Sequence, residues 1–338
     1  MKNAKASETA TQPAPPPGYS VRPARMDEVG PVTDLIAACE RALGAPQTLF
    51  EDDIRIQWTA PRFDLSTDTW IVTSDGAIVG YGEFQDTRSD AGLEAFGVVH
   101  PVHHGRGLGA FLLRLIEARA QDHATSQEER LELNNFVVSG DERARHLMET
   151  SGYERARIFW HMVIDLAQPI PEVALPDGIE VRAFDIERDN HAVHELMEDA
   201  FSHHYGYSPT PFDEWWREIS SRSDFDPSLW VLAWHGSELV AGVIGGSRGD
   251  DAWIHDVGVL SRWRRRRLAW SLLSRSLTEF RERGYRHAGL NVDALNQTGA
   301  TDLYRRIGFQ VRTAFDAYRK RIGPRPSAGD AATPRAAG

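Results

Sequence analysis

The chain of 338 residues has a single cysteine, Cys39, and no apolar run that approaches the ~20 residues needed to span a bilayer. One cysteine excludes a framework of internal disulfides and suits a reducing compartment. The opening stretch MKNAKASETATQPAPPPG lacks the apolar middle of a secretory signal. We therefore expect a cytoplasmic protein with no membrane partner.

Basic residues are also fewer than acidic ones, 38 against 49, and the formal net charge is -11. An acidic chain is a poor match for nucleic acid or for an anionic membrane surface. The basic run WRRRR at 263–267 is the exception, but Trp263 is the only aromatic residue within it. We expect this run to be a solvated or phosphate-binding face, with no nucleic-acid partner.

Both ends of the chain are rich in Pro, Ala, Ser and Gly, which predicts disordered tails over 1–18 and 323–338. The whole chain is 41% hydrophobic, and the stretch between the tails is long enough for more than one core. A proline-bearing segment that ends in PDG predicts a linker at 168–178. The expected domains are therefore 19–167 and 179–322.

These two domains repeat each other in sequence. Three pairs of stretches share an offset of 160 residues: YSVRPA at 19 with IEVRAF at 179, TWIVTSDG at 69 with LWVLAWHG at 229, and VVHPVHHGRGLGAFLL at 98 with GVLSRWRRRRLAWSLL at 258. A fourth pair, METSGY at 148 and YRRIGF at 304, has an offset of 156. This conserved order indicates two copies of one domain.

Each copy alternates β-rich stretches with helical ones. Apolar residues recur at helical spacing over 108–121 and over 268–280, which predicts a helix at each place. The β-rich stretches at 69–76 and 229–236 both end in a dipeptide typical of turns. Strand and helix in repeated alternation predict an α/β fold.

The stretch HHGRGLGAFLL at 103–113 places three glycines immediately before an apolar helix. Without Cβ atoms, such a loop lets backbone N–H groups approach phosphate oxygens, and the helix N-terminus adds further donors. A tight strand-to-helix turn without a ligand is the alternative. A dinucleotide-binding fingerprint fits less well, because the glycines read G-x-G-x-G and no suitable acidic strand follows.

Two motifs carry a family resemblance. V-x-P-x-x-H-G-R-G-L-G in the first copy and N-Q-T-G-A-x-x-L-Y-x-x-x-G-F at 296–309 in the second resemble the acetyl-CoA loop and the following helix of the GNAT superfamily of N-acetyltransferases. The tandem layout over 19–322 resembles mycothiol synthase-like actinobacterial proteins with two GNAT domains. The resemblance implies two tandem domains, each a mixed, mostly antiparallel sheet flanked by helices.

The same resemblance implies an enzyme that moves an acetyl group from acetyl-CoA, as co-substrate, to a primary amine of a small molecule. It implies no metal. A monomer and a homodimer both remain open. The alternative function is a noncatalytic coenzyme A-binding or regulatory module, in which Arg267 has silenced the second copy.

In this family the loop holds the pyrophosphate of coenzyme A through backbone amides. The implied cofactor-binding residues of the first copy are Val99, His104, Gly105, Arg106, Gly107, Leu108 and Gly109. Those of the second copy are Val257, Val259, Arg264, Arg265, Arg266, Arg267, Leu268, Ala269 and Asn296. Arg267 departs from the family pattern because it occupies the usual glycine site. Two outcomes are open: its side chain obstructs the pyrophosphate, or it swings outward and adds a charged contact.

The two copies differ where the family does its chemistry. The resemblance implies a tyrosine near the start of the last helix that protonates the departing thiolate, and the second copy has Tyr304 there. The first copy has Met148, whose thioether cannot donate a proton. We therefore expect catalysis in the second copy and a degenerate first copy that binds acetyl-CoA without turnover. A core tyrosine on an amphipathic helix is the alternative for Tyr304.

Transfer also needs a group that takes a proton from the acceptor ammonium. Many family members place a glutamate eleven residues before the first basic position of the loop, but that count gives Trp253 and Leu93 here. His255 lies two residues after Trp253, on the same face of a regular strand, where serotonin N-acetyltransferase likewise has a histidine. An imidazole, with an ordinary pKa of ~6.5, suits a base near neutrality. Asp256 should point to the opposite face, and a merely hydrogen-bonded histidine is the alternative.

Overall fold

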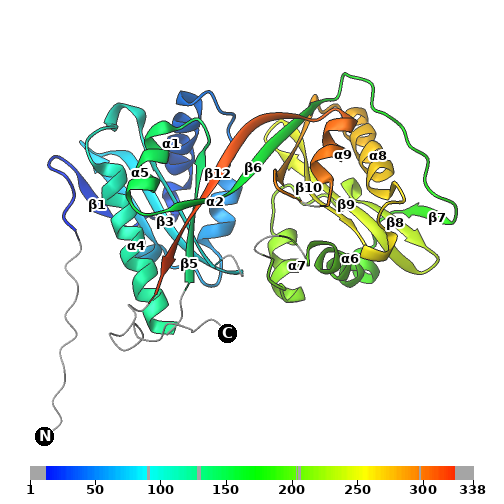
Figure 1. Cartoon of the computed structure of the whole chain (residues 1–338), viewed down its shortest axis with the longest axis horizontal. Coiled ribbons are helices and arrows are strands. Elements are labelled where there is room, and N and C mark those ends of the chain that lie inside the picture. The colour runs from blue at the N-terminus through cyan, green and yellow to red at the C-terminus, as the bar shows by residue number, and fades with distance from the viewer. Residues whose placement is uncertain are drawn as a thin grey trace, which may run out of the picture.

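The computed structural model describes residues 13–89, 92–127, 131–202, 204, 207–296 and 298–323. Most of both predicted tails, residues 1–12 and 324–338, lies outside the described residues. The molecule consists of two halves side by side, with the long strands β6 and β12 crossing between them (Figure 1). No helix within the described ranges is long and apolar enough to cross a membrane.

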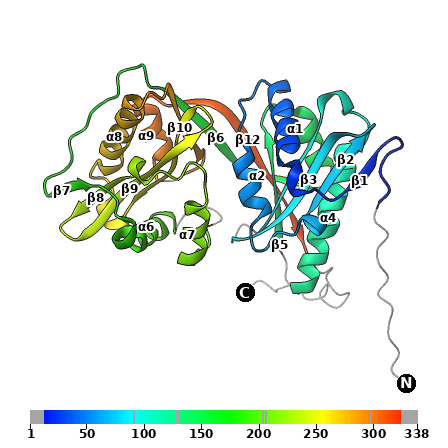
Figure 2. The same ribbon diagram turned by 180° about the vertical axis from the view of Figure 1, so that it is seen from behind.

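The first copy is a sheet with helices on both faces. Its strands are β1 (Ser20–Arg22), β2 (Thr69–Ser74), β3 (Ala77–Ser89), β4 (Gly92–Val99), β5 (Leu131–Val138) and β6 (Glu154–Asp165). Its helices are α1 (Val29–Ala42), α2 (Glu51–Trp58), α3 (Leu65–Asp68), α4 (Leu108–Gln127) and α5 (Glu142–Thr150), with 3-10 turns at Met26–Glu28 and Pro101–His103. One core forms under α4, and α1 and α2 cover the other face (Figure 2).

The second copy repeats this plan. Its strands are β7 (Ile179–Arg182), β8 (Val231–His235), β9 (Glu238–Arg248), β10 (Asp251–Val259), β11 (His287–Asp293) and β12 (Gln310–Ile322). Its helices are α6 (Ile186–Phe201), α7 (Phe212–Ser220), α8 (Leu268–Glu282) and α9 (Ala300–Ile307), with 3-10 turns at Pro227–Leu229 and Ser261–Trp263. Helices α8 and α9 cover one face, and α6 and α7 the other.

The twelve strands of the described residues form one sheet in the order β1-β2-β3-β4-β5-β12-β6-β11-β10-β9-β8-β7. Neighbours pair antiparallel except β4 with β5 and β10 with β11, which are parallel. Each copy is therefore a mixed, mostly antiparallel sheet flanked by helices, and the predicted fold class is confirmed. The predicted helices are confirmed as α4 and α8, each slightly longer than the pattern indicated.

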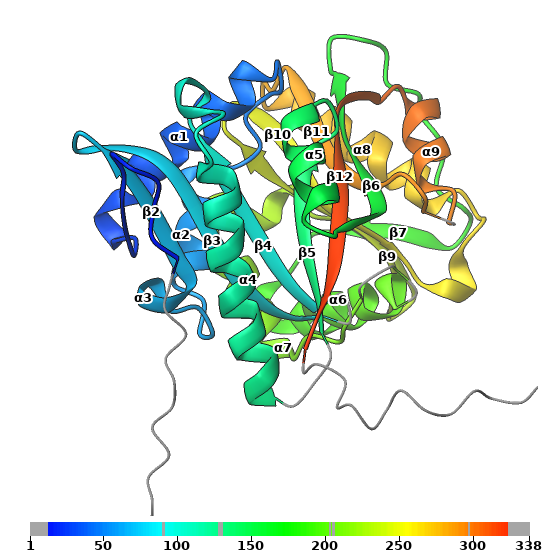
Figure 3. The ribbon, with the colours of Figure 1, turned by 60° about the vertical axis from the view of Figure 1, so that its left-hand side comes forward.

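The final strand of each copy pairs inside the other copy. Strand β12, the last of the second copy, lies between β5 and β6, while β6 of the first copy pairs with β11 (Figure 3). The side chains follow the same exchange, since Tyr318 and Ile322 pack in the core under α4. Met162 and Ile164 in turn pack in the core under α8. The two copies thus complete each other's cores, although the sequence divides them near 168–178.

Candidate active site

A gap in strand pairing opens at the same place in both copies. Strand β10 pairs with β9 from Asp251 to Val259, but its parallel pairing with β11 covers only Ala252 and Trp253. In the first copy, β4 and β5 likewise pair over only three residues, ending at Ala95. The predicted residues Val99, Val257 and Val259 lie beyond these last pairs. The strand edge next to them therefore keeps backbone groups available for a ligand.

The loops that follow have the same backbone in both copies. Gly105 and Gly107 have φ of 74° and 80°, and Arg265 and Arg267 have φ of 63° and 64°. The carbonyl of Gly107 accepts the Phe111 N–H at 3.0 Å, as that of Arg267 accepts the Ser271 N–H at 3.0 Å. Left-handed backbone disfavours side chains by on the order of 1 kcal/mol per residue. Two arginines therefore hold a conformation that glycine would adopt without strain.

The first basic residue of each loop reaches back to its own strand. His104 Nε2 lies 2.8 Å from the Val99 carbonyl oxygen. Arg264 Nε donates to the Val259 carbonyl at 3.3 Å, and its terminal nitrogen donates to the Ala200 carbonyl at 3.0 Å. Both side chains tie the loop to the strand, which gives them a role in shaping the loop.

The other loop residues have different surroundings in the two copies. Arg106 donates to the Tyr19 hydroxyl at 2.9 Å, whereas Arg266 lies over the Trp263 ring at 4.6 Å. Arg265 and Arg267 form no ion pair with any described residue. The helix that follows begins at Leu108 in one copy and at Leu268 in the other, both buried. A Cβ placed on Gly105 would meet no atom within 4 Å, while one on Gly109 would lie 3.3 Å from Leu147.

Tyr304 and Met148 occupy equivalent positions. The Tyr304 carbonyl accepts the Phe309 N–H at 3.0 Å, and the Met148 carbonyl accepts the Tyr153 N–H at 3.0 Å. Both side chains are buried. Burial, with a smaller contribution from the nearby negative charge of Asp256, raises the pKa of Tyr304 well above its ordinary value. The phenol therefore stays protonated at neutral pH and is able to act as an acid.

His255 sits on a β-bulge. Ile254 pairs with Gly245 and Asp256 pairs with Ile244, so His255 is the extra residue of β10. The pairing of β4 with β3 runs without such a shift from Leu93 to Val99. Bulges re-aim side chains and are common beside active sites.

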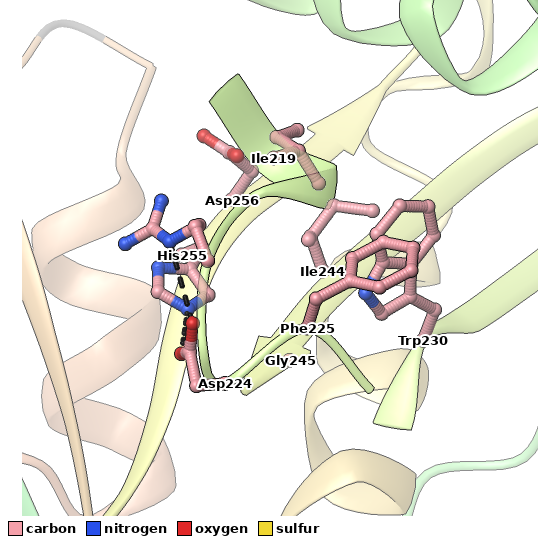
Figure 4. Close-up of a pocket in the computed structure, with 9 residues that line it drawn as sticks. Ile219, Asp224, Phe225, Trp230, Ile244, Gly245, His255 and Asp256 are labelled. Carbon is pink, nitrogen blue, oxygen red and sulfur yellow. Dashed lines mark hydrogen bonds and ion pairs between the residues drawn. The ribbon is translucent and has the colours of Figure 1, made fainter. Parts of the chain in front are cut away.

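The bulge corrects one expectation. On a regular strand Asp256 would face away from His255, but both residues line the same small pocket (Figure 4). The remaining lining residues, mostly apolar, are Ile219, Arg222, Asp224, Phe225, Trp230, Ile244 and Gly245. Burial raises the pKa of Asp256, although the charges of His255 and Arg222 oppose this shift. The extra residue in β10 breaks the alternation on which the expectation rested.

Asp224, which the sequence reasoning did not single out, is the partner of His255. Its Oδ2 lies 2.8 Å from His255 Nε2 (Figure 4). Asp224 lies in the loop after α7, 31 residues before the histidine, and no motif connects the two. Only the fold brings them together.

Asn296, the last predicted cofactor residue, caps its own turn. Its side-chain oxygen accepts the Thr298 N–H at 2.7 Å and also the Thr298 hydroxyl. Ala269 follows Leu268 in the first turn of α8. No group of three or more His, Cys, Asp or Glu side chains that could hold a metal occurs in the part of the chain that the structure describes.

A family comparison agrees with this geometry. A model of the acetyltransferase (GNAT) family matches residues 32–153 and 190–309. The chain therefore belongs to this family, with one match in each copy, and the predicted family and tandem layout are confirmed.

Individual relatives cover nearly the whole chain. It is 31% identical over 304 residues to a mycothiol acetyltransferase of Geodermatophilus obscurus, which covers 86% of this chain and 94% of that protein. It is also 31% identical over 314 residues to a mycothiol acetyltransferase of Streptomyces bingchenggensis, with 87% and 95% covered. These similarities support the prediction of an acetyltransferase.

Solved structures share the fold. A GCN5-related N-acetyltransferase from Sphaerobacter thermophilus is 32% identical, with a TM-score of 0.78 and 91% of this chain and 97% of that chain covered. A tandem GNAT protein from the clavulanic acid biosynthesis pathway is 18% identical, with a TM-score of 0.69 and 91% and 99% covered. The second match shows that the tandem fold extends to distant sequences.

Proposed function

We propose that the chain is an acetyl-CoA-dependent N-acetyltransferase that acts on a primary amine of a small molecule, with the chemistry in the second copy. The observation that supports this most is the pocket beside the unpaired edge of β10, which brings His255 and Asp256 together, with Asp256 acting electrostatically on buried Tyr304. The first copy has Met148 in place of the tyrosine and no counterpart of the bulge. It binds the co-substrate without turnover.

The loops fit a pyrophosphate. Each presents left-handed backbone ahead of a helix N-terminus, where unpaired N–H groups and the helix dipole favour an anion. The backbone of the second loop is the same as that of the first despite its arginines. We therefore propose that Arg267 adds charge toward the phosphates and does not obstruct them, together with Arg264, Arg265 and Arg266.

The proton transfers follow from the site. Acetyl-CoA supplies an activated thioester. His255 accepts one proton from the acceptor ammonium, so that the free amine forms the new C–N bond. Tyr304 donates its proton to the sulfur as the C–S bond breaks, and it regains one from the attacking nitrogen. The proton on His255 passes to solvent, so the overall reaction releases one proton.

The relatives carry the name mycothiol acetyltransferase. We propose that the acceptor here is of the same kind, the free amine from which an acetylated thiol such as mycothiol is formed. The pocket beside His255 combines an apolar wall with charged groups, but its cavity of about 20 Å³ has room only for the amine end of such an acceptor.

The test uses the full chain with acetyl-CoA and a panel of deacetylated mycothiol, an aminoglycoside and a peptide N-terminus. Coenzyme A is quantified by chromatography, because a thiol-bearing acceptor would itself react with a thiol reagent. Tyr304→Phe should lower turnover by ~10²–10⁴ while acetyl-CoA affinity holds, since only the hydroxyl is lost. Tyr285→Phe, which also loses only a hydroxyl in the second copy, is the control and should leave turnover unchanged.

Wild-type turnover in Tyr304→Phe would place the acid elsewhere. If the wild-type chain binds acetyl-CoA but acetylates no amine, the noncatalytic binding module is the better description. Failure of acetyl-CoA to bind at the second loop would identify Arg267 as an obstruction.

A further inference from the structure

The side chain of Asp224 is held on three sides. Its Oδ2 lies 2.8 Å from His255 Nε2 and accepts the Ser247 N–H at 3.1 Å, while its Oδ1 lies 3.4 Å from Arg222 Nε. The Asp224 and His255 side chains are only 14% and 11% exposed. This carboxylate therefore has little freedom to leave the imidazole.

The first copy holds both segments that carry these contacts. In the loop, the Ser223 hydroxyl donates to Asp52 at the start of α2. On β9, Arg248 donates to Asp53 at 3.1 Å and lies over the Trp253 ring at 4.5 Å. The residues next to Asp224 and Ser247 are thus anchored to α2 across the boundary between the copies.

The hydrogen bond selects one form of the imidazole. A carboxylate only accepts, so neutral His255 must carry its proton on Nε2 to make this bond. Nδ1 has no hydrogen-bond partner among the described residues. The nitrogen left with a free lone pair is therefore Nδ1.

We propose that Asp224 is a positioning residue, which fixes His255 in the Nε2-protonated form and leaves Nδ1 as the base for the acceptor amine. The role of Nδ1 as a base rests on the proposed function, whereas the assignment of the tautomer rests only on the hydrogen bond to Asp224. When His255 takes a proton, both ring nitrogens carry hydrogen and the negative carboxylate stabilises the positive ring.

Other charges also face this pair. Arg222 comes from the same loop as Asp224, and Asp256 follows His255 on β10. Glu218 of α7 faces Asp256, and Arg248 of β9 faces Asp224. Burial raises the pKa of Asp224, but the hydrogen bond and charge of His255, with Arg222, more than offset it. The pKa of Asp224 is therefore below its ordinary value, and this group stays ionised at neutral pH.

The experiment measures the His255 ring by nitrogen NMR in the full chain, with His255→Gln used to assign its signals. The wild-type ring should be the Nε2-protonated tautomer at high pH. Asp224→Asn should reduce that tautomer, because an amide can donate to the imidazole as well as accept from it. Asp226→Asn removes a carboxylate from the same loop that contacts Arg283 and not His255, and should change neither signal.

Kinetics with an identified acceptor provide the second readout. Asp224→Asn should lower kcat by roughly 10- to 100-fold, less than the ~10²–10⁴-fold expected for loss of the base itself. It should leave the KM for acetyl-CoA unchanged. Asp224→Glu, which keeps the charge, should restore part of the tautomer preference.

Two results would overturn the inference: an Nδ1-protonated ring in the wild-type chain, or an Asp224→Asn variant with an unchanged tautomer. Neither depends on turnover. If no amine is acetylated while Asp224→Asn still changes the tautomer, the positioning inference stands and the proposed function fails. If turnover occurs but the tautomer is wrong, the opposite holds.

Discussion

The two copies agree in the backbone of the loop and differ in the strand that leads to it. The left-handed positions Gly105 and Gly107 recur as Arg265 and Arg267, although the second loop contains no glycine. The strand before the loop is regular in the first copy and bulged at His255 in the second. Phe96 pairs with Glu83 where Asp256 pairs with Ile244. The backbone of the loop is thus kept without its glycines, whereas the strand before it differs between the copies by one inserted residue.

The largest expected effects test whether the copies are independent. Tyr318→Ala removes a fully buried ring that β12 places in the core of the first copy, and should destabilise the protein by about 2–5 kcal/mol. Hydrogen exchange should show the loss of protection in α4 of the first copy, although Tyr318 belongs to the second in sequence.

Met162→Ala is the reciprocal variant, since β6 places Met162 in the core under α8. It should destabilise the protein by an amount in the same range, and hydrogen exchange should show the loss of protection in α8 of the second copy. Val311→Ala, on β12 but 41% exposed, is the control and should have a small effect. If each variant lowered hydrogen-exchange protection only in the copy that contains the substituted residue in sequence, the strand exchange would not contribute to stability.

A smaller effect separates the copies by pH. Glu83 accepts hydrogen bonds from the Tyr81 hydroxyl and from Gln57, yet burial dominates and raises its pKa from 4.5 to about 7. Between these values the folded chain keeps a proton that the unfolded chain releases. The contribution of Glu83 to the free energy of unfolding is therefore fully present below pH 4.5. It is lost as pH rises through 7, which lowers the stability of the protein by roughly 1–3 kcal/mol.

Urea unfolding from pH 4.5 to 7.5 checks this, because Glu83→Gln should flatten the dependence. Glu142→Gln, on the exposed surface of α5, should leave the wild-type slope intact. The second copy has Ile244 at the corresponding position and should contribute nothing of this kind. An unchanged slope in Glu83→Gln would assign the pH dependence to another group.

The smallest expected effect concerns the loops themselves. Arg267→Gly should stabilise the free protein by on the order of 1 kcal/mol, since glycine adopts φ of 64° without strain. It should also weaken acetyl-CoA binding and reduce its salt dependence, because one cation near the phosphates is lost. Thermal melting and calorimetric titration measure the two changes.

The reciprocal variant Gly107→Arg should destabilise the first copy by a similar amount, because an arginine is strained at the φ of 80° that Gly107 adopts. Arg266→Ala, which does not occupy a left-handed position, should bring no gain in stability. Tighter acetyl-CoA binding in Arg267→Gly would instead mean that the arginine obstructs the site.

The sequence by itself determined the repeat, the two loop helices, the mixed fold class and the family. The helices and the first loop are local features, marked by apolar spacing and by glycine spacing, whereas the mixed fold class and the family followed from the resemblance of two motifs. The sequence also aligned Tyr304 with Met148, since a short helix with a fixed ending preserves its register.

Only the tertiary structure decided the rest. The exchange of β6 and β12 is a choice between equivalent strand partners, which the sequence of either strand does not specify. The bulge at His255 turned Asp256 into the pocket, because one inserted residue reverses the facing of a strand. Asp224 reached His255 from a separate loop, and contacts between residues distant in sequence are set by how the elements pack.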